Sequence, residues 1–246
     1  MSNQLQLISF NIDKWSANSL GLSDLTSWQK WSQYQIWPED EAIESALIPA
    51  MMRRRMSTLS KLAVQTAIEL LSDQQISHQP IDYLVFSSRH GELHRSTELI
   101  RNILAGEEAS PMNFSQSVHN TAAGLSTIAT KQAIPVTSIA GGENTFHSAL
   151  IEAWLYLKQY PNARVLLVDF DEPLPADYAE YEDKKFKGYA LGLILSSGDK
   201  WQVAQYPKID TISHLPQALN FLTHYLRKDP DWIIAGERNS WEWQQA

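Results

Sequence analysis

The stretch PVTSIAGGENTFHSALIEAW, residues 135–154, has the pattern of a β-strand that runs into a sharp turn and then into a long helix. A turn between a strand and a helix is a common mount for a nucleophilic side chain. The side chain at this turn is Glu143, which follows Gly141 and Gly142. A carboxylate is a weak nucleophile, but the dipole and free N–H groups of a helix N-terminus stabilise it as an anion. The pattern therefore predicts an elbow with the geometry of a reactive site and no nucleophile.

Histidines are the other side chains that could transfer a proton or bind a metal. His90 lies in SRHGE, directly after a buried strand pattern, where α/β sheets often place functional groups. His90 and His94 have helical spacing, but no third ligand is near them, so a structural loop is the better interpretation. The other histidines of this half show no ligand spacing: His78, His119 and His147. The sequence has no cysteine, no G-x-S-x-G elbow and no Gly-rich phosphate loop. We therefore expect no catalytic residue, no metal and no cofactor.

Apolar periodicity predicts the elements that position these residues. Strands are expected at 5–12, 81–87, 134–140, 164–170 and 231–235, and residues 188–196 and 201–206 have the pattern of an antiparallel pair. Helices are expected at 57–71, 93–104, 120–131, 144–160 and 215–227. Residues 13–50 are predicted to be irregular, and their tryptophans are interpreted as a packed cap over a core rather than a ligand-stacking surface: Trp15, Trp28, Trp31 and Trp37.

Strands that alternate with helices and end in a hairpin indicate an α/β layered fold, in which helices pack on a mixed sheet. A chain of 246 residues suffices for one large domain or two small ones. The one boundary that the pattern suggests lies near Gly198–Pro207, and the roughly forty residues after it are too few for a second core. We therefore divide the chain into a domain, residues 1–200, and a C-terminal remnant packed on it, residues 201–246.

Composition excludes several classes of function. The net charge is −8, and the one basic block is MMRRRM at residues 51–56, so nucleic acid is not expected as a partner. The sequence has no apolar run of about 18 residues, which predicts no membrane span. Its first residues have neither the basic nor the apolar region of a signal peptide. We expect a cytoplasmic globular protein.

Six segments between residues 53 and 195 occur in an order that resembles the N-terminal half of the β-ketoacyl synthases, which are condensing enzymes with a thiolase fold. They are RRRMSTLSKLAVQTA, VFSSRHGEL, SPMNFSQSVHNTAAGLSTIA, TSIAGGENTFHSALIEA, RVLLVDFDEP and GYALGLIL. The chain looks especially similar to the short β-ketoacyl-synthase-like N-terminal domain family. The resemblance implies a thiolase-like layered fold, of which the chain holds essentially the N-terminal half.

In the family that the chain resembles, the elbow has the form T-A-C-S-S, and its cysteine takes the acyl chain from a carrier protein. Glu143 falls on the cysteine position, so the resemblance implies an elbow that keeps its turn and has lost its nucleophile. The family's catalytic histidines come from its C-terminal half, most of which is expected to be missing here. His214 and His224 match no family motif and are predicted to be surface or capping residues. The resemblance therefore implies a non-catalytic subunit of the chain-length-factor type.

The resemblance also implies partners. We expect a heterodimer, or a dimer of heterodimers, with a full-length β-ketoacyl-ACP synthase of a polyketide, aryl polyene or fatty-acid-like pathway. Acyl carrier protein is expected to dock mainly on that partner, because this chain and carrier proteins are both acidic and like charges repel. Two alternatives stay open: a malonyl-ACP decarboxylase of the cysteine-less ketosynthase type, and a stand-alone homodimeric acyl- or lipid-binding protein.

The stretch SPMNFSQSVHN lies at the dimer interface in the family that the chain resembles. Its side chains Met112, Phe114, Val118 and Asn120, together with Phe146 beside the elbow, are predicted to bound the partner's acyl tunnel. Methionine suits this role because its side chain fits irregular cavities. The same residues could equally fill the interface without reaching the tunnel, and the sequence does not separate the two roles.

Overall fold

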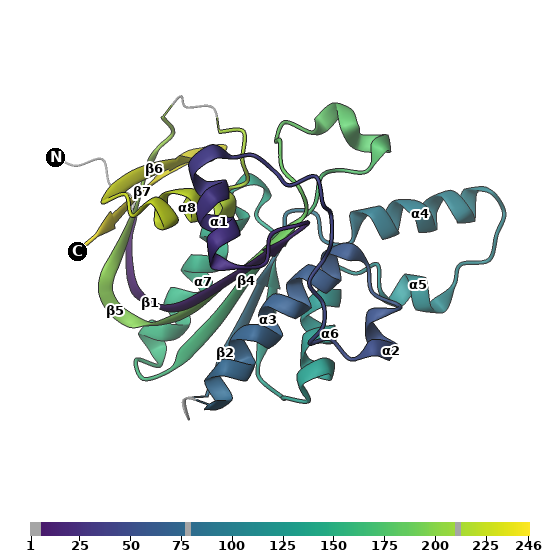
Figure 1. Cartoon of the computed structure of the whole chain (residues 1–246), viewed down its shortest axis with the longest axis horizontal. Helices are drawn as coiled ribbons and strands as arrows, with labels where there is room; N and C mark the ends of the chain where they lie inside the picture. The colour runs from purple at the N-terminus through teal and green to yellow at the C-terminus, as the bar shows by residue number, and fades with distance from the viewer. Residues whose placement is uncertain (1–5, 77–79, 210–212) are drawn as a thin grey trace.

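The computed structural model describes residues 6–76, 80–209 and 213–246 (Figure 1). The strands are β1 (Gln6–Ser19), β2 (Tyr83–Ser87), β3 (Val136–Ile139), β4 (Arg164–Asp171), β5 (Tyr189–Pro207), β6 (Asp231–Ala235) and β7 (Asn239–Gln245). The α-helices are α1 (Leu25–Tyr34), α2 (Ala50–Arg53), α3 (Thr58–Ile76), α4 (Leu93–Leu104), α5 (Pro111–Ser115), α6 (Thr121–Thr130), α7 (Thr145–Gln159) and α8 (Gln217–Arg227). Two short 3₁₀ helices are η1 (Gly142–Asn144) and η2 (Ala176–Tyr181).

One mixed sheet organises this part of the chain. Its strands follow the order β3-β2-β4-β5-β7-β6, and β1 pairs with β5 outside this path. β2 is parallel to β3 and β4, whereas β5 is antiparallel to β4, β7 and β1. Parallel strands of one sheet need long crossover connections. α4 to α6 connect β2 to its neighbour β3, and α7 connects β3 to β4, which lies on the other side of β2. The sheet with its packed helices confirms the predicted thiolase-like α/β class.

Helices cover both faces of the central strands. Successive residues of β4 point to opposite faces: Val165 and Leu167 join a core with α7 and α8, while Leu166 and Val168 join a core with α3 and α6. All four side chains are fully buried. Burial on both faces explains why β4 has a continuous apolar sequence instead of an alternating one. The elbow leads into α7, which packs on this buried core.

The predicted antiparallel pair at 188–196 and 201–206 is wrong, because both segments belong to the single strand β5. Each segment pairs with β1, and the register jumps between Phe10, opposite Trp201, and Asn11, opposite Ser196. The four residues between these partners form a bulge that the Asn11 side chain holds: it donates to the Ser197 carbonyl oxygen (3.2 Å) and accepts from Lys200 N–H (3.3 Å). A side chain from a distant strand thus replaces backbone pairing.

The prediction of an irregular segment at residues 13–50 is wrong for its first part. β1 continues to Ser19, and α1 begins after Asp24, whose carboxylate accepts a hydrogen bond from Ser27 N–H (3.0 Å). Trp28 and Trp31 of α1 are buried and pack edge to face at 5.3 Å, and Trp28 Nε1 donates to the Ala17 carbonyl oxygen. The tryptophans therefore form the predicted cap.

The C-terminal part of the chain adds β6 and β7 to the same sheet, and α8 packs against the core. β7 was not predicted, and its inward side chains Trp241 and Trp243 are buried. The predicted boundary between residues 200 and 201 falls inside the continuous strand β5. Within the described residues, no helix combines the length and the apolar character needed to cross a membrane.

Candidate functional site

The predicted elbow consists of the end of β3, the turn η1 and the start of α7. Gly142 has a φ of +59°, a left-handed conformation that favours glycine. The Thr145 hydroxyl accepts a hydrogen bond from Gly141 N–H (2.9 Å) and donates one to the Gly142 carbonyl oxygen (2.7 Å). These contacts close the turn and place Glu143 at the N-terminal end of α7.

A lysine from the loop between β4 and β5 holds the Glu143 carboxylate. Lys184 Nζ lies 3.5 Å from Glu143 Oε1 and 3.2 Å from Asp183 Oδ2, and it donates to the Ser213 carbonyl oxygen at 3.0 Å. The sequence predicted that the helix N-terminus stabilises the Glu143 anion, but it did not predict that Lys184 also binds it. Lys184 follows an acidic run and carries no motif, so no signal in the sequence pointed to its role. The ion pair further lowers the nucleophilic character of residue 143.

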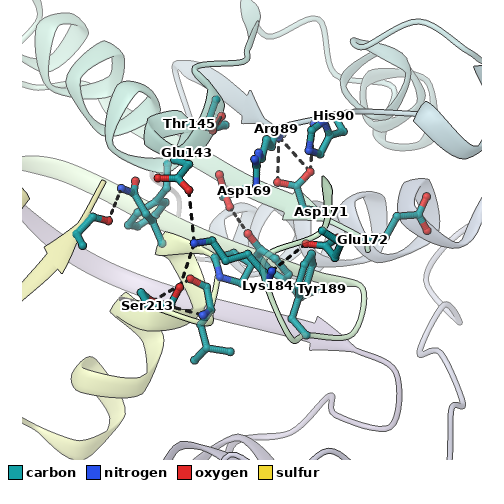
Figure 2. Close-up of a pocket in the computed structure, with 18 residues that line it drawn as sticks. Arg89, His90, Glu143, Thr145, Asp169, Asp171, Glu172, Lys184, Tyr189 and Ser213 are labelled. Carbon is teal, nitrogen blue, oxygen red and sulfur yellow. Dashed lines mark hydrogen bonds and ion pairs between the residues drawn. The ribbon is translucent and has the colours of Figure 1, made fainter. Parts of the chain in front are cut away.

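A narrow pocket lies beside Glu143 (Figure 2). The elbow, the C-terminal end of β4, the loop after β4 and the start of α8 line it. Its free space is about 40 Å³. One water needs about 10–15 Å³, so the pocket accommodates roughly three water molecules.

Two aspartates at the end of β4 form the polar wall of this pocket. Asp169 accepts hydrogen bonds from the hydroxyls of Ser87 and Tyr189, both at 2.7 Å. Asp171 accepts from Arg89 N–H with both oxygens, at 2.9 and 3.0 Å. Both carboxyl groups are buried, and their partners come from the end of β2, from the residues directly after it and from the start of β5. The sequence did not single out either aspartate, although RVLLVDFDEP ends a buried strand with acidic residues.

Burial changes the protonation of this wall. Burial, together with the nearby charge of Asp171, raises the pKa of Asp169 to about 7. Burial also raises the pKa of Asp171, although N–H groups and the Ser88 hydroxyl oppose the rise. It raises the pKa of the adjacent Glu172 as well. The pocket can therefore hold protons near neutral pH, but its carboxyl groups do not supply a nucleophile for thioester exchange.

A hydrogen-bonded hub joins the elbow helix to the C-terminal segment. Asn144 Oδ1 accepts from Gln217 Nε2 (3.0 Å) and from Trp241 Nε1 (3.1 Å). His147 Nδ1 lies 2.6 Å from Gln217 Oε1, and Trp243 Nε1 donates to His147 Nε2 at 3.1 Å. Because Nε2 accepts, Nδ1 carries the proton. The hub connects α7, α8 and β7 beneath the elbow.

The hub makes His147 a structural residue. Burial lowers its pKa to about 3, so the ring is neutral at physiological pH, and both of its nitrogens are occupied. Trp241 stacks on the ring at 4.5 Å. A side chain at Gly236 would bring a Cβ to 2.1 Å from Asn144 Oδ1, so this glycine lets the β6–β7 turn approach the elbow. Two sequence patterns contain residues of this hub, N-x-x-H at the start of α7 and W-x-W in β7, and neither was used to predict it.

Of the two histidines with helical spacing, His94 has a side-chain hydrogen-bond contact, whereas the buried Nε2 of His90 has none among the described residues. His94 Nε2 lies 2.8 Å from the Pro173 carbonyl oxygen, and burial lowers the pKa of His90. His119 Nε2 contacts the Ser88 carbonyl oxygen at 2.8 Å. His78 lies outside the described residues. Within the described ranges, the structure contains no group of three or more acidic or histidine side chains that could hold a metal ion.

The C-terminal histidines have the kind of role that the sequence predicts. His224 Nδ1 lies 2.7 Å from Asp229 Oδ2 near the C-terminal end of α8, and its ring stacks on Trp232 at 5.4 Å. The His214 carbonyl oxygen accepts from Lys185 N–H at 2.8 Å. His224 therefore lies in the last turn of α8, at the opposite end from Gln217 and away from the elbow.

The predicted interface residues do not form one cluster. Met112, Phe114 and Val118 are exposed large apolar side chains on and after α5, and Asn120 is exposed at the start of α6. Phe146 instead lies in the core between α7, α8 and β7, almost fully buried. Its ring contributes to the wall of the pocket at the elbow.

Comparisons with known proteins bear on the family and the fold of the chain. A family model described as the β-ketoacyl synthase N-terminal domain matches residues 28–244. A chain in the solved complex of a ketosynthase (ApeO) with its chain length factor (ApeC) from Xenorhabdus doucetiae is 30% identical, with a TM-score of 0.86; the match covers 97% of this chain and 100% of that chain. No curated protein matches the sequence.

More distant structures share the fold. The ishigamide ketosynthase/chain length factor is 17% identical with a TM-score of 0.59, and the match covers 83% of this chain and 68% of that one. A β-ketoacyl synthase from Burkholderia phymatum is 11% identical with a TM-score of 0.58, and the match covers 92% and 71%.

Proposed function

The chain belongs to the β-ketoacyl synthase N-terminal domain family, and from this premise we propose that it is a non-catalytic subunit of the chain-length-factor type. It forms a heterodimer with an active β-ketoacyl-ACP synthase and bounds the acyl tunnel of that partner. The pathway is of the polyketide, aryl polyene or fatty-acid-like kind, and acyl carrier protein docks mainly on the partner. The observation that carries this proposal is the ion pair between Glu143 and Lys184 at the elbow.

The elbow lacks what acyl transfer requires. Thioester exchange needs a thiolate or another activated nucleophile, and the sequence has no cysteine. Lys184 forms an ion pair with the Glu143 carboxylate, which occupies the elbow. These features support a scaffold role and argue against a covalent acyl intermediate on this subunit.

The histidine at the elbow argues against the decarboxylase alternative. Decarboxylation by a ketosynthase-like site requires histidines whose ring nitrogens face the thioester. The two ring nitrogens of His147 contact Gln217 and Trp243 instead. His224 lies at the far end of α8 and contacts Asp229.

The edge of the sheet next to α6 supports a dimer interface. β3 ends the strand order of the described sheet, so one of its edges is open to another chain. Val136 of β3 and Ile128 of α6 are exposed apolar residues beside that edge. We place the ketosynthase contact on residues 113–127 and 136–140, with an area of about 800 Å² or more per partner. The Xenorhabdus complex, in which a ketosynthase binds its chain length factor, supports such an assembly.

Co-expression with a full-length β-ketoacyl-ACP synthase that has an intact T-A-C-S-S elbow tests the proposal. We expect the two chains to co-purify in equal amounts, because each covers the open edge and apolar surface of the other. Size-exclusion chromatography with light scattering measures the stoichiometry, and a ketosynthase from an unrelated pathway is the control. A monodisperse homodimer that ignores the ketosynthase would contradict the proposal and favour the lipid-binding alternative.

The tunnel role of α5 is a separate prediction. Replacing Phe114 or Met112 with alanine is expected to shift the products of the reconstituted pair toward longer chains, because a smaller side chain lengthens the tunnel. Mass spectrometry of the products measures the shift, and Ile36→Ala, at an exposed apolar residue away from α5, is the matched control. Unchanged products from an intact complex would assign these side chains to plain interface packing.

A further inference from the structure

The segment that connects β4 to β5 forms one wall of the elbow pocket. Its first part contains η2 and is the green loop that projects from the body in Figure 1. Its second part, residues 182–188, belongs to no helix or strand. Glu182, Lys184 and Phe186 line the pocket, whereas Asp183 and Lys185 are exposed. Alternate side chains of an extended segment face opposite sides, so residues 182–188 lie along the pocket as a strap with one inward face.

Two neighbouring charges tie the strap to two different parts of the fold. Lys184 Nζ lies 3.5 Å from Glu143 Oε1, and Figure 2 shows the lysine side chain pointing toward the elbow. Asp183 Oδ1 lies 3.6 Å from Nη1 of Arg89, which follows β2. The strap is therefore fixed by ion pairs both to the elbow and to the segment after β2.

The other contacts of the strap are mainly polar. Lys184 Nζ donates to the Ser213 carbonyl oxygen at 3.0 Å, and Lys185 N–H donates to the His214 carbonyl oxygen at 2.8 Å. Phe186 adds an aromatic contact, with its ring 6.0 Å from the ring of Tyr189. The strap thus rests on the elbow and on the residues before α8 through side-chain and single backbone contacts, without the continuous pairing of a strand.

These contacts hold the strap less firmly than the sheet is held. Ion pairs at partly exposed positions contribute little in water, because solvent screens the charges. The side chain of Asp183 is 52% exposed and that of Glu143 is 27% exposed, whereas the residues of β4 after Arg164 are buried. Segments with few buried apolar contacts open at a lower free energy than the core does. We therefore expect the strap to open before the sheet does.

We propose that the strap is a lid on the elbow pocket, that the ion pair between Lys184 and Glu143 holds it closed, and that it opens while the sheet stays folded. The glutamate at the elbow then has a role of its own, since its carboxylate binds the lysine that closes the pocket. Opening admits water and small solutes to the buried carboxyl groups of Asp169 and Asp171. The inference concerns this chain alone and holds whether or not a ketosynthase binds to it.

Hydrogen exchange resolved to single amides tests the lid in the full chain, with all variants compared in the same assembly. The reporter is the Lys185 amide, because its acceptor, the His214 carbonyl oxygen, lies outside the strap. Its protection factor measures how rarely the strap opens, and the amides of β4 measure opening of the sheet. Lys184→Met is expected to lower the protection of the reporter about tenfold, because methionine forms neither the ion pair nor the hydrogen bond.

Two further variants show whether the effect comes from the ion pair. Glu143→Gln removes the charge on the elbow side and is expected to lower the protection of the reporter as well. Combining it with Lys184→Met is expected to add little, since the two residues act through one contact. Lys185→Met is the matched control, because it removes the same charge from the next residue, whose side chain is exposed, and keeps the backbone N–H.

Salt gives a test that needs no substitution. Raising the ionic strength from about 0.1 M to about 1 M is expected to lower the protection of the reporter in the wild type, because salt screens the ion pair. The same change is expected to leave Lys184→Met nearly unaffected. If a variant does not fold, the salt dependence of the wild type decides the question.

The outcomes are distinct. Lower protection of the strap in both Lys184→Met and Glu143→Gln, with β4 protected as in the wild type and Lys185→Met unchanged, supports the lid. Unchanged protection in folded Lys184→Met, or no salt dependence in the wild type, overturns the role of the ion pair and with it the proposal. Equal protection of the strap and β4 in the wild type also overturns it, because the strap would then open only when the sheet unfolds.

Discussion

Replacing Gln217 with leucine is expected to lower the free energy of unfolding by about 3 kcal/mol. The amide of this nearly buried side chain accepts from His147 and donates to Asn144 and to the Ala235 carbonyl oxygen. Leucine would leave the His147 Nδ1–H and the Ala235 oxygen without these partners. Each buried polar group left unsatisfied costs about 1–3 kcal/mol. Because the hub joins the elbow to β6 and β7, we also expect the C-terminal strands to open first.

Urea unfolding monitored by tryptophan fluorescence measures this loss. Asn220→Leu is the matched control, since Asn220 lies one turn along the same helix and, among the described residues, its amide makes one hydrogen bond, to the Ser213 hydroxyl. The control is expected to change the free energy of unfolding by less than about 1 kcal/mol. Equal stability of Gln217→Leu and wild type would show that the hub does not hold the C-terminal segment on the elbow.

Elements whose pattern of buried residues is visible within a single segment of the chain could be predicted from the sequence. α4 and β6 have the predicted bounds, and β4 was recognised because both of its faces are apolar. The strand, turn and helix of the elbow follow from apolar periodicity together with Gly141 and Gly142. These features depend on neighbours within a few residues along the chain.

Features that join distant residues could not be predicted. Lys184 and Glu143 are far apart in sequence, and neither position has a local pattern that selects the other. Gln217 contacts His147 across 70 residues. β5 is one strand because Asn11, from the other end of the chain, bridges its bulge. Each of these contacts depends on the order of strands in the sheet, which periodicity alone does not specify.

The wild-type protein is expected to lose stability as the pH rises, and replacing Asp169 with asparagine is expected to remove much of this loss. The pKa of Asp169 is raised from 3.8 to about 7 in the folded state, so between these values the folded protein holds a proton that the unfolded chain releases. The stabilising contribution is complete below the unfolded pKa and is lost as the pH rises through the folded pKa. Each pH unit in this window costs about 1.4 kcal/mol, which sets an upper limit of about 4 kcal/mol.

Asparagine has nearly the same shape and stays neutral, and the hydroxyls of Ser87 and Tyr189 can rotate to meet its amide. We therefore expect the variant to match wild type within about 1 kcal/mol near pH 4 and to exceed it by about 2–4 kcal/mol at pH 8. The variant is expected to keep some pH dependence of its free energy of unfolding, which is due to Asp171 and Glu172, because their pKa values are also raised. His147 acts in the opposite sense, since its lowered pKa makes stability fall as the pH falls below about 6.5.

Comparison of urea unfolding curves at each pH separates these contributions, because the difference between Asp169→Asn and wild type cancels the terms that both proteins share. Glu39→Gln removes the same charge at an exposed position and is expected to leave the pH dependence unchanged. A difference that does not grow between pH 4 and pH 8 would mean that Asp169 is ionised throughout. The wall of the elbow pocket would then carry a permanent negative charge beside Glu143, and Lys184 alone would have to compensate it.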